Sequence, residues 1–161
     1  MRDIIESAGI HISELNFKNR PIQVNYKYRV VFQVSKVVLV LGMTSSKAGS
    51  SILKLQIISD ALDNEELLDY LKWLIENDSQ EFVRSWRYNP LLSRAVGYSN
   101  SEGLTEYSKT GKLVLTEKGQ ALYNDIYKSK ELFEYEKKQL LKIRKKLSDT
   151  KLMKILEKGN I

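Results

Sequence analysis

The side chains best suited to chemistry in this chain are hydroxyl, amide and cationic groups that suit nucleic-acid recognition. Ser93, Arg94 and Asn100 lie on a predicted helix, and Lys109 and Lys112 lie on the predicted hairpin that follows it. Arginine and asparagine can hydrogen-bond to base edges, and lysine neutralises backbone phosphate. If this helix and hairpin read DNA, the helix enters a major groove while the hairpin touches the flanking backbone. The alternatives are ordinary solvated lysines on a turn and a face that docks on protein.

A second group of cations lies near the C-terminal end of the chain. Residues 128–158 hold eleven Lys or Arg against five Asp or Glu, whereas the first 127 residues carry no net charge. The candidate DNA-binding cations here are Lys142, Arg144, Lys145 and Lys146. Three interpretations stay open: binding of DNA phosphate through counterion release, a solvated helix face, and a partner helix that inserts apolar side chains into a groove. The apolar side chains of the third interpretation are Leu140, Leu141, Ile143 and Leu147.

The residue types that carry most enzyme chemistry are scarce. The chain has no cysteine and one histidine, His11, which has no triad partner by spacing. The loop GMTSSKAGSS, residues 42–51, contains glycine, lysine and serine without the spacing of a P-loop. Carboxylate pairs such as Glu65 with Glu66 fit helix capping better than acid–base catalysis. We therefore expect a protein that is not an enzyme, with no catalytic residue, no cofactor and no metal ion.

Length and composition indicate a folded, water-soluble protein. The 161 residues are 42% hydrophobic and 29% charged, which is ordinary for a globular chain. The first residues, MRDIIESAGIHISEL, lack the basic end and apolar run of an export signal. The most apolar stretch, residues 30–41, contains polar residues and is shorter than the roughly 20 residues that cross a bilayer. We expect a soluble cytoplasmic protein with no membrane partner.

Helical periodicity dominates the first half of the chain. Residues 28–41 are rich in β-branched side chains, but their apolar positions recur at helical spacing over fourteen residues, which favours a helix over a strand. A second helix is predicted to start near Ile52, where a preceding serine can serve as its N-cap. A third is predicted to start at Asp63, which forms a capping-box pattern with Glu66. Residues 1–25 show only weak periodicity and are interpreted as a loosely packed arm.

The second half of the chain predicts helices around a hairpin. Asn89 followed by Pro90 is a favourable helix start, and Gly103 supplies the left-handed conformation that commonly ends a helix. The other predicted elements are a short strand within residues 79–88 (SQEFVRSWRY), hairpin strands at 104–107 and 113–115 joined at Gly111, a helix capped by Thr116 with Ala121, Leu122 and Ile126 facing inward, a long helix over 130–147, and a short helix after Ser148.

These elements indicate a mainly α (α+β) fold: a winged helix-turn-helix with a small two-stranded β-hairpin wing and extra C-terminal helices. We divide the chain into an N-terminal arm (1–25), a winged-helix domain (26–127) and a basic C-terminal helical extension (128–161). Aromatic side chains beside the helix that starts at Asn89, such as Trp86, could stack on bases or pack in the core. For Trp73, in an apolar helix, we expect burial.

Three segments together carry a family resemblance. They are SSILKLQIISDALDNEELLDYLKWL (50–74), NPLLSRAVGYSNSEGL (89–104) and GLTEYSKTGKLVLTEKGQAL (103–122). Over residues 28–127 the chain resembles the middle component of ABC-three-component, or Lamassu-type, bacterial antiphage defence systems. The resemblance implies a non-catalytic accessory subunit that docks on an SMC-like ABC ATPase with long coiled coils, beside a separate effector subunit that is often a nuclease. The first 25 residues and the lysine-rich tail depart from the family.

The resemblance and the charge pattern leave two functions to separate. The first is the accessory subunit, which docks on the ATPase and contacts double-stranded DNA through the winged helix or the tail. The alternative is a free-standing winged-helix transcriptional regulator, which is expected to form a symmetric dimer on a palindromic site. Co-purification with a large coiled-coil ATPase distinguishes the two.

Overall fold

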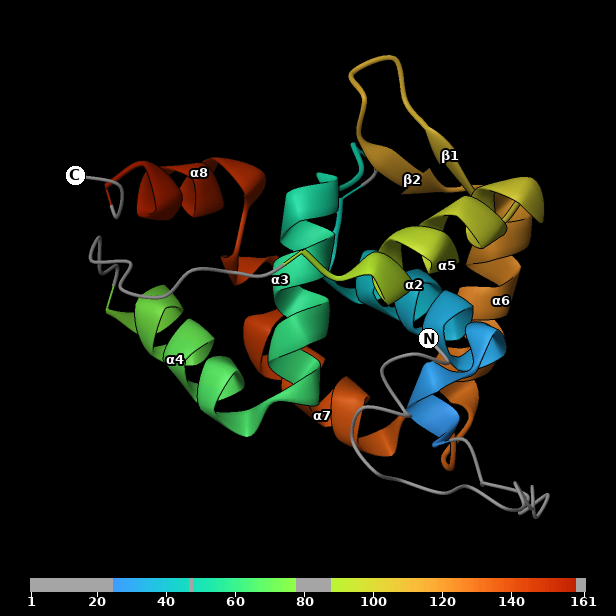
Figure 1. Cartoon of the computed structure of the whole chain (residues 1–161), viewed down its shortest axis with the longest axis horizontal. Coiled ribbons are helices and arrows are strands. Elements are labelled where there is room, and N and C mark those ends of the chain that lie inside the picture. Colours follow the sequence, from blue (N-terminus) through green and yellow to red (C-terminus); the bar gives the residue numbers. More distant parts are fainter. Residues whose placement is uncertain (1–24, 47, 78–87, 159–161) are drawn as a thin grey trace, which may run out of the picture.

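The computed structural model describes residues 25–46, 48–77 and 88–158, and these are mainly helical (Figure 1). The elements are the 3-10 turn η1 (Tyr26–Tyr28), α2 (Val30–Thr44), α3 (Ile52–Asp63), α4 (Glu65–Glu76), α5 (Pro90–Ser101), β1 (Thr105–Tyr107), β2 (Leu113–Leu115), α6 (Glu117–Lys128), α7 (Glu134–Ile143), the 3-10 turn η2 (Arg144–Lys146) and α8 (Asp149–Lys158). The mainly α class with one small antiparallel hairpin is confirmed. His11, the arm up to residue 24 and the strand predicted within 79–88 lie outside the described residues, except Tyr88.

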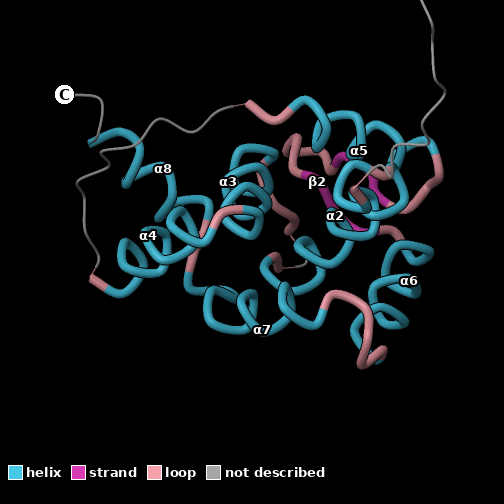
Figure 2. Tube along the Cα trace, turned by 60° about the horizontal axis from the view of Figure 1, so that its bottom comes forward, coloured by secondary structure: helices cyan, strands magenta, loops and turns pink. Residues whose placement is uncertain are grey.

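Helix α2 forms the centre of the molecule, which confirms the helical interpretation of this β-branched stretch. Helices α3, α5, α6 and α7 and strand β2 all contact it, and Figure 2 shows it between them. Val37, Val38 and Leu39 have no exposed surface, as expected for a helix that is apolar on every side. Neither α2 nor any other helix of the described ranges is long and apolar enough to cross a membrane.

One cation is buried in this apolar helix. Lys36 is only 1% exposed, and its Nζ donates hydrogen bonds to the carbonyl oxygen of Ser59 (2.9 Å) and to Oδ2 of Asp63 (2.7 Å). A buried ammonium is strongly unfavourable unless it is paired and hydrogen-bonded, so these contacts make its burial possible. They also join α2 to the C-terminal end of α3.

The boundary between α3 and α4 corrects the predicted cap. Ser51 caps α3 as expected, with Oγ accepting from the Lys54 amide. The N-cap of α4 is Asn64, not Asp63: the Asn64 side-chain oxygen accepts from the Leu67 amide at 3.3 Å. Asp63 is the last residue of α3, and its carboxylate accepts a hydrogen bond from Lys36. The side-chain amide of the next residue, Asn64, therefore caps α4.

The expected burial of Trp73 is wrong, because its side chain is 47% exposed. The buried side of α4 is formed by Leu68, Leu71 and Leu74. A helix turns about 100° per residue, so the position just before Leu74 points away from this stripe. The indole stacks on Tyr70 instead, with ring centroids 6.2 Å apart.

The hairpin forms as predicted, and the backbone of Ser50 pairs with its second strand. β1 and β2 pair antiparallel, with Thr105 opposite Leu115, and Gly111 in the turn has a φ of 73°. Ser50, between α2 and α3, exchanges both backbone hydrogen bonds with Leu113 (3.0 and 2.9 Å). Thr116 caps α6 through the Gly119 amide, as expected.

Two predictions about the later helices need correction. On α6, Ile126 is buried and Leu122 is half-buried, but Ala121 is exposed, so the inward stripe is narrower than predicted. The long helix expected over 130–147 is limited to α7, because Phe133 and Arg144 at its ends have φ values of 55° and 35°. At Phe133 a tertiary contact accompanies this backbone: its ring stacks on Phe32 with centroids 4.8 Å apart.

The C-terminal helices belong to the same core as α2. Leu140, Ile143, Leu147, Leu152 and Ile155 are all buried within it. The predicted helix after Ser148 is confirmed as α8, and the Ser148 hydroxyl accepts from the Lys151 amide at 3.0 Å. The basic tail is therefore fixed to the body of the protein by its apolar side chains.

We predict that Lys36→Ala lowers the free energy of unfolding by about 2–4 kcal/mol, because it removes a buried stem and leaves Asp63 without its closest cation. The matched control is Lys138→Ala, which breaks an exposed pair with Glu134 on α7 and should change stability little. Urea unfolding followed by circular dichroism measures both. Equal effects of the two variants would contradict a structural role for the buried ammonium.

Candidate functional site

The start of α5 is fixed to α3 by a polar junction. The Asn89 side-chain oxygen accepts from the amides of Leu91 (3.0 Å) and Leu92 (3.2 Å), so Asn89 caps α5, and the predicted helix start at Asn89 and Pro90 is confirmed. The Asn89 side-chain nitrogen donates to Oδ1 of Asp60 on α3 at 2.9 Å. Burial raises the pKa of Asp60, and the hydrogen bond from Asn89 opposes part of this rise. The N-terminal end of α5 is thereby held in place by its own cap residue.

The end of α5 is joined just as closely to the hairpin. Ser99 and Thr105 are buried, with their hydroxyl oxygens 2.8 Å apart, and the Thr105 hydroxyl donates to the side-chain oxygen of Asn100. Gly103, with a φ of 64°, turns the chain so that the Leu104 amide reaches the Ser99 carbonyl oxygen at 2.8 Å. Asn100, a candidate for base recognition, therefore uses its amide oxygen to hold β1.

A groove of about 290 Å³ runs between α3, α5 and β1, and we call it the α5 groove. Its lining residues are Ile52, Gln56, Tyr88, Leu92, Ser93, Val96, Gly97 and Tyr107. Tyr88, at 69%, and Tyr107 are strongly exposed, as is Tyr98 nearby on α5. Gly97 leaves open space, since a Cβ added there would have no neighbour within 4 Å. Exposed aromatic rings around an open apolar groove are typical of a binding surface.

This face carries little free positive charge. Arg94 and Lys109 are exposed and make no ion pair within the described residues, but Lys112 is bound to Oδ2 of Asp149 at 2.9 Å. The exposed Glu102 and Glu106, at the end of α5 and on β1, offset the two free cations. Of the other predicted contacts, Ser93 accepts from Gln56 at 3.2 Å. The face is therefore aromatic and close to neutral.

The tail cations are placed differently. Lys142, Arg144 and Lys146 are exposed and have no ion-pair partner in the described part of the chain, while the side chain of Lys145 lies outside it. The interpretation of this segment as a partner helix fails for three of its four apolar residues. Leu140, Ile143 and Leu147 have no exposed surface because they fill the protein's own core, which leaves only Leu141 exposed.

Asp149 joins the hairpin, α3 and α8. Its Oδ1 accepts from the amide (3.1 Å) and hydroxyl (2.8 Å) of Ser51, and its Oδ2 binds Lys112. Burial alone raises the pKa of Asp149, but the hydrogen bonds from Lys112 and Ser51 outweigh it and hold the pKa below its usual value. Beside it, burial lowers the pKa of Lys54, whose Nζ donates to the Thr44 carbonyl oxygen at 2.9 Å.

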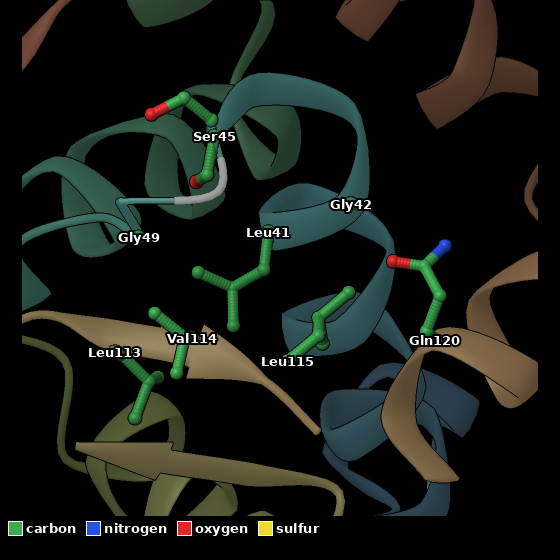
Figure 3. A pocket seen from close by; sticks show the side chains of 9 residues that line it. Leu41, Gly42, Ser45, Gly49, Leu113, Val114, Leu115 and Gln120 are labelled. Atoms are coloured by element: carbon green, nitrogen blue, oxygen red, sulfur yellow. The ribbon is translucent and has the colours of Figure 1, made fainter. Parts of the chain in front are cut away.

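A second cavity, of about 320 Å³, lies where the end of α2 faces β2 and α6 (Figure 3). Leu41, Val114 and Leu115 supply apolar walls, and Ser45 and Gln120 are among its polar side chains. None of the residues that line it is ionisable, so it offers hydrogen bonding and apolar contact without acid–base chemistry. Among the described residues, no group of His, Cys, Asp or Glu is arranged to hold a metal ion.

The structure adds residues that the charge pattern did not single out. Gly97, Tyr98 and Tyr107 form or flank the α5 groove, and Asp149 decides whether Lys112 is free. The sequence signal for the first group is a glycine inside an amphipathic helix next to a tyrosine.

No family model, characterised protein or solved structure matches this chain.

We predict that Asp149→Asn weakens the acid dependence of stability. Because the pKa of Asp149 is lowered by folding, its stabilisation is complete above its unfolded value near pH 4 and is lost as the pH falls through the folded value. The variant should therefore be less stable than the parent at pH 7, and the difference should shrink toward pH 2–3. Thermal unfolding between pH 2 and 7 measures this.

Asp125→Asn on α6 is the control for the Asp149 substitution. Asp125 is exposed and its side chain makes no hydrogen bond in the described residues. Its replacement should leave the pH profile of stability unchanged. A stability difference for Asp149→Asn that stays constant with pH would contradict the role assigned to its charge.

Proposed function

We propose that this chain is a non-catalytic winged-helix subunit that docks on a protein partner through the α5 groove and the exposed tyrosines around it, Tyr88, Tyr98 and Tyr107. The observation that carries this proposal is the character of the face: exposed aromatic rings around an open groove, with two free cations offset by two carboxylates. Aromatic side chains are enriched where proteins bind proteins. A DNA-reading face would instead need several free cations to neutralise phosphate.

The order and pairing of the elements support the winged-helix assignment. A first helix (α2) is followed by an extended residue, Ser50, that pairs with the hairpin, then by α3, then after α4 by α5 and the hairpin itself. In winged-helix modules the helix before the hairpin and the hairpin form one binding face. The hydrogen bond from Asn89 holds α5 to α3, and that between Ser99 and Thr105 holds α5 to β1, so the face is preorganised.

The family resemblance suggests the partner. We propose that it is an SMC-like ABC ATPase with long coiled coils, in a bacterial defence complex that also contains an effector, and that the groove accepts an apolar side chain of that ATPase. A rigid face with exposed tyrosines suits this role, because large rings add contact area at little entropic cost. ATP hydrolysis and DNA cleavage would then belong to the other subunits.

We predict that Gly97→Trp abolishes co-purification of the ATPase with the tagged chain expressed from its native locus. The indole would fill the α5 groove, and the open space at Gly97 means that the fold should tolerate it. The matched control is Ala121→Trp, which adds the same side chain at an exposed position of α6 and should leave co-purification intact. Circular dichroism of both variants verifies that they fold.

Two outcomes would overturn this function. One is that Gly97→Trp retains the ATPase as well as the parent chain does. The other is that the tagged chain purifies as a symmetric dimer without any ATPase and protects one palindromic site, which is the behaviour of a transcriptional regulator.

Contact with DNA, in this proposal, belongs to the tail. We predict that replacing Lys142, Arg144, Lys145 and Lys146 by Ala together reduces the salt dependence of DNA binding. The magnitude of the slope of log K against log salt should fall by up to about 3.6, since each of four phosphate contacts contributes about 0.9. Replacing Arg94 and Lys109 by Ala should have a smaller effect. Fluorescence anisotropy with duplex DNA at several salt concentrations measures both variants. Loss of binding only in the Arg94 and Lys109 variant would assign DNA recognition to the α5 face.

A further inference from the structure

A third cavity, larger in volume than the α5 groove and the cavity beside β2, is lined by residues of η1, the start of α2, the end of α3 and the start of α7. Its volume is about 390 Å³, and we call it the aromatic pocket. Its lining residues are Tyr26, Lys27, Phe32, Leu62, Glu131, Phe133, Glu134, Tyr135 and Glu136. It shares no lining residue with the α5 groove, and the proposed docking function does not use it.

Aromatic rings form a continuous wall of this pocket. Tyr26 meets Phe32 edge-to-face with centroids 5.0 Å apart, and Phe32 stacks on Phe133 at 4.8 Å. A fourth ring, Tyr135, also lines it. Tyr26 and Tyr135 are 55% and 41% exposed, so ring surface is open to a ligand. The faces of such rings carry negative electrostatic potential and attract cations.

The charged side chains of the aromatic pocket also favour a cationic ligand. Glu131, Glu134 and Glu136 line it, whereas Lys27 is the single cation among its lining residues. The Lys27 ammonium lies 3.9 Å from Oδ1 of Asp63, so part of its charge is already balanced. Glu134 binds Lys138, which leaves Glu131 and Glu136 without an ion-pair partner in the described ranges. Two unpaired carboxylates therefore border the aromatic wall.

We infer that the aromatic pocket binds an organic cation, an alkylated ammonium or guanidinium group held between the rings and the carboxylates. Such a group is large, weakly hydrated and partly apolar, so it gains both from contact with ring faces and from nearby negative charge. A small metal ion would gain little from the rings. A neutral apolar group would leave the carboxylates unused. The cation can be a free compound or an arginine or methylated lysine of another protein.

Chemical-shift perturbation of the ¹⁵N-labelled full chain tests this site with three probes. The first is choline, the second is its uncharged isostere 3,3-dimethyl-1-butanol, and the third is the peptide acetyl-Gly-Arg-Gly-amide. We expect saturable shifts, centred on residues 131–136 and Phe32, from choline or the peptide and not from the isostere. Tighter binding of choline would indicate a free compound as ligand, and tighter binding of the peptide a protein side chain.

Variants separate the charge of the site from its aromatic surface. Glu131→Gln with Glu136→Gln keeps the shape and removes the charge, and should weaken binding of the cation about three- to tenfold. Tyr135→Leu keeps apolar surface but removes a ring face, and should weaken it similarly. The control Glu117→Gln, on α6, should have no effect. Equal shifts from the uncharged isostere, or no shifts from either cation, would overturn the inference, whatever the result for the α5 groove.

Discussion

The burial of residues 36–41 of α2 is the constraint on which the rest of the structure depends. A helical stretch that is apolar on every side gains stability when other elements cover it, and here α3, α5, α6, α7 and β2 pack against α2. The same burial places the Lys36 ammonium in the interior, where it must be hydrogen-bonded. Ser59 and Asp63 supply those bonds from one helix, so the satisfaction of a single cation also fixes where α3 lies against α2.

Close packing links α2 to the candidate binding face through α6 and the hairpin. A Cβ at Gly42 would overlap the Tyr123 ring, so α6 approaches α2 closely only because residue 42 is glycine. A Cβ at Gly119 would overlap the Leu104 carbonyl oxygen, so the start of the hairpin also approaches α6 closely only because residue 119 is glycine. The hairpin beside the α5 groove is therefore closely packed on α6, and α6 on α2. Preorganisation of this kind reduces the entropy lost when a partner binds.

The sequence predicted those features that depend on neighbouring residues and missed those that depend on distant ones. The serine and Thr116 caps and the helix start at Asn89 and Pro90 depend on local sequence patterns, and all three are confirmed. The failures share a different cause. Phe133 interrupts the predicted long helix while its ring contacts Phe32, about a hundred residues earlier in the chain. The cap of α4 moves by one residue because Asp63 is engaged by α2.

The same distinction applies to the candidate site. Residue type identifies the candidate cations, but whether each is free depends on tertiary contacts. Lys112 is bound by Asp149, while Lys142 and Arg144 have no ion-pair partner in the described residues. A cation held by an internal carboxylate contributes little to the binding of phosphate, because its field is largely cancelled at short range. The fold therefore separates two kinds of surface, an aromatic face with little net charge at α5 and free cations near the end of α7. A partner with an apolar side chain suits the first surface, and a polyanion suits the second.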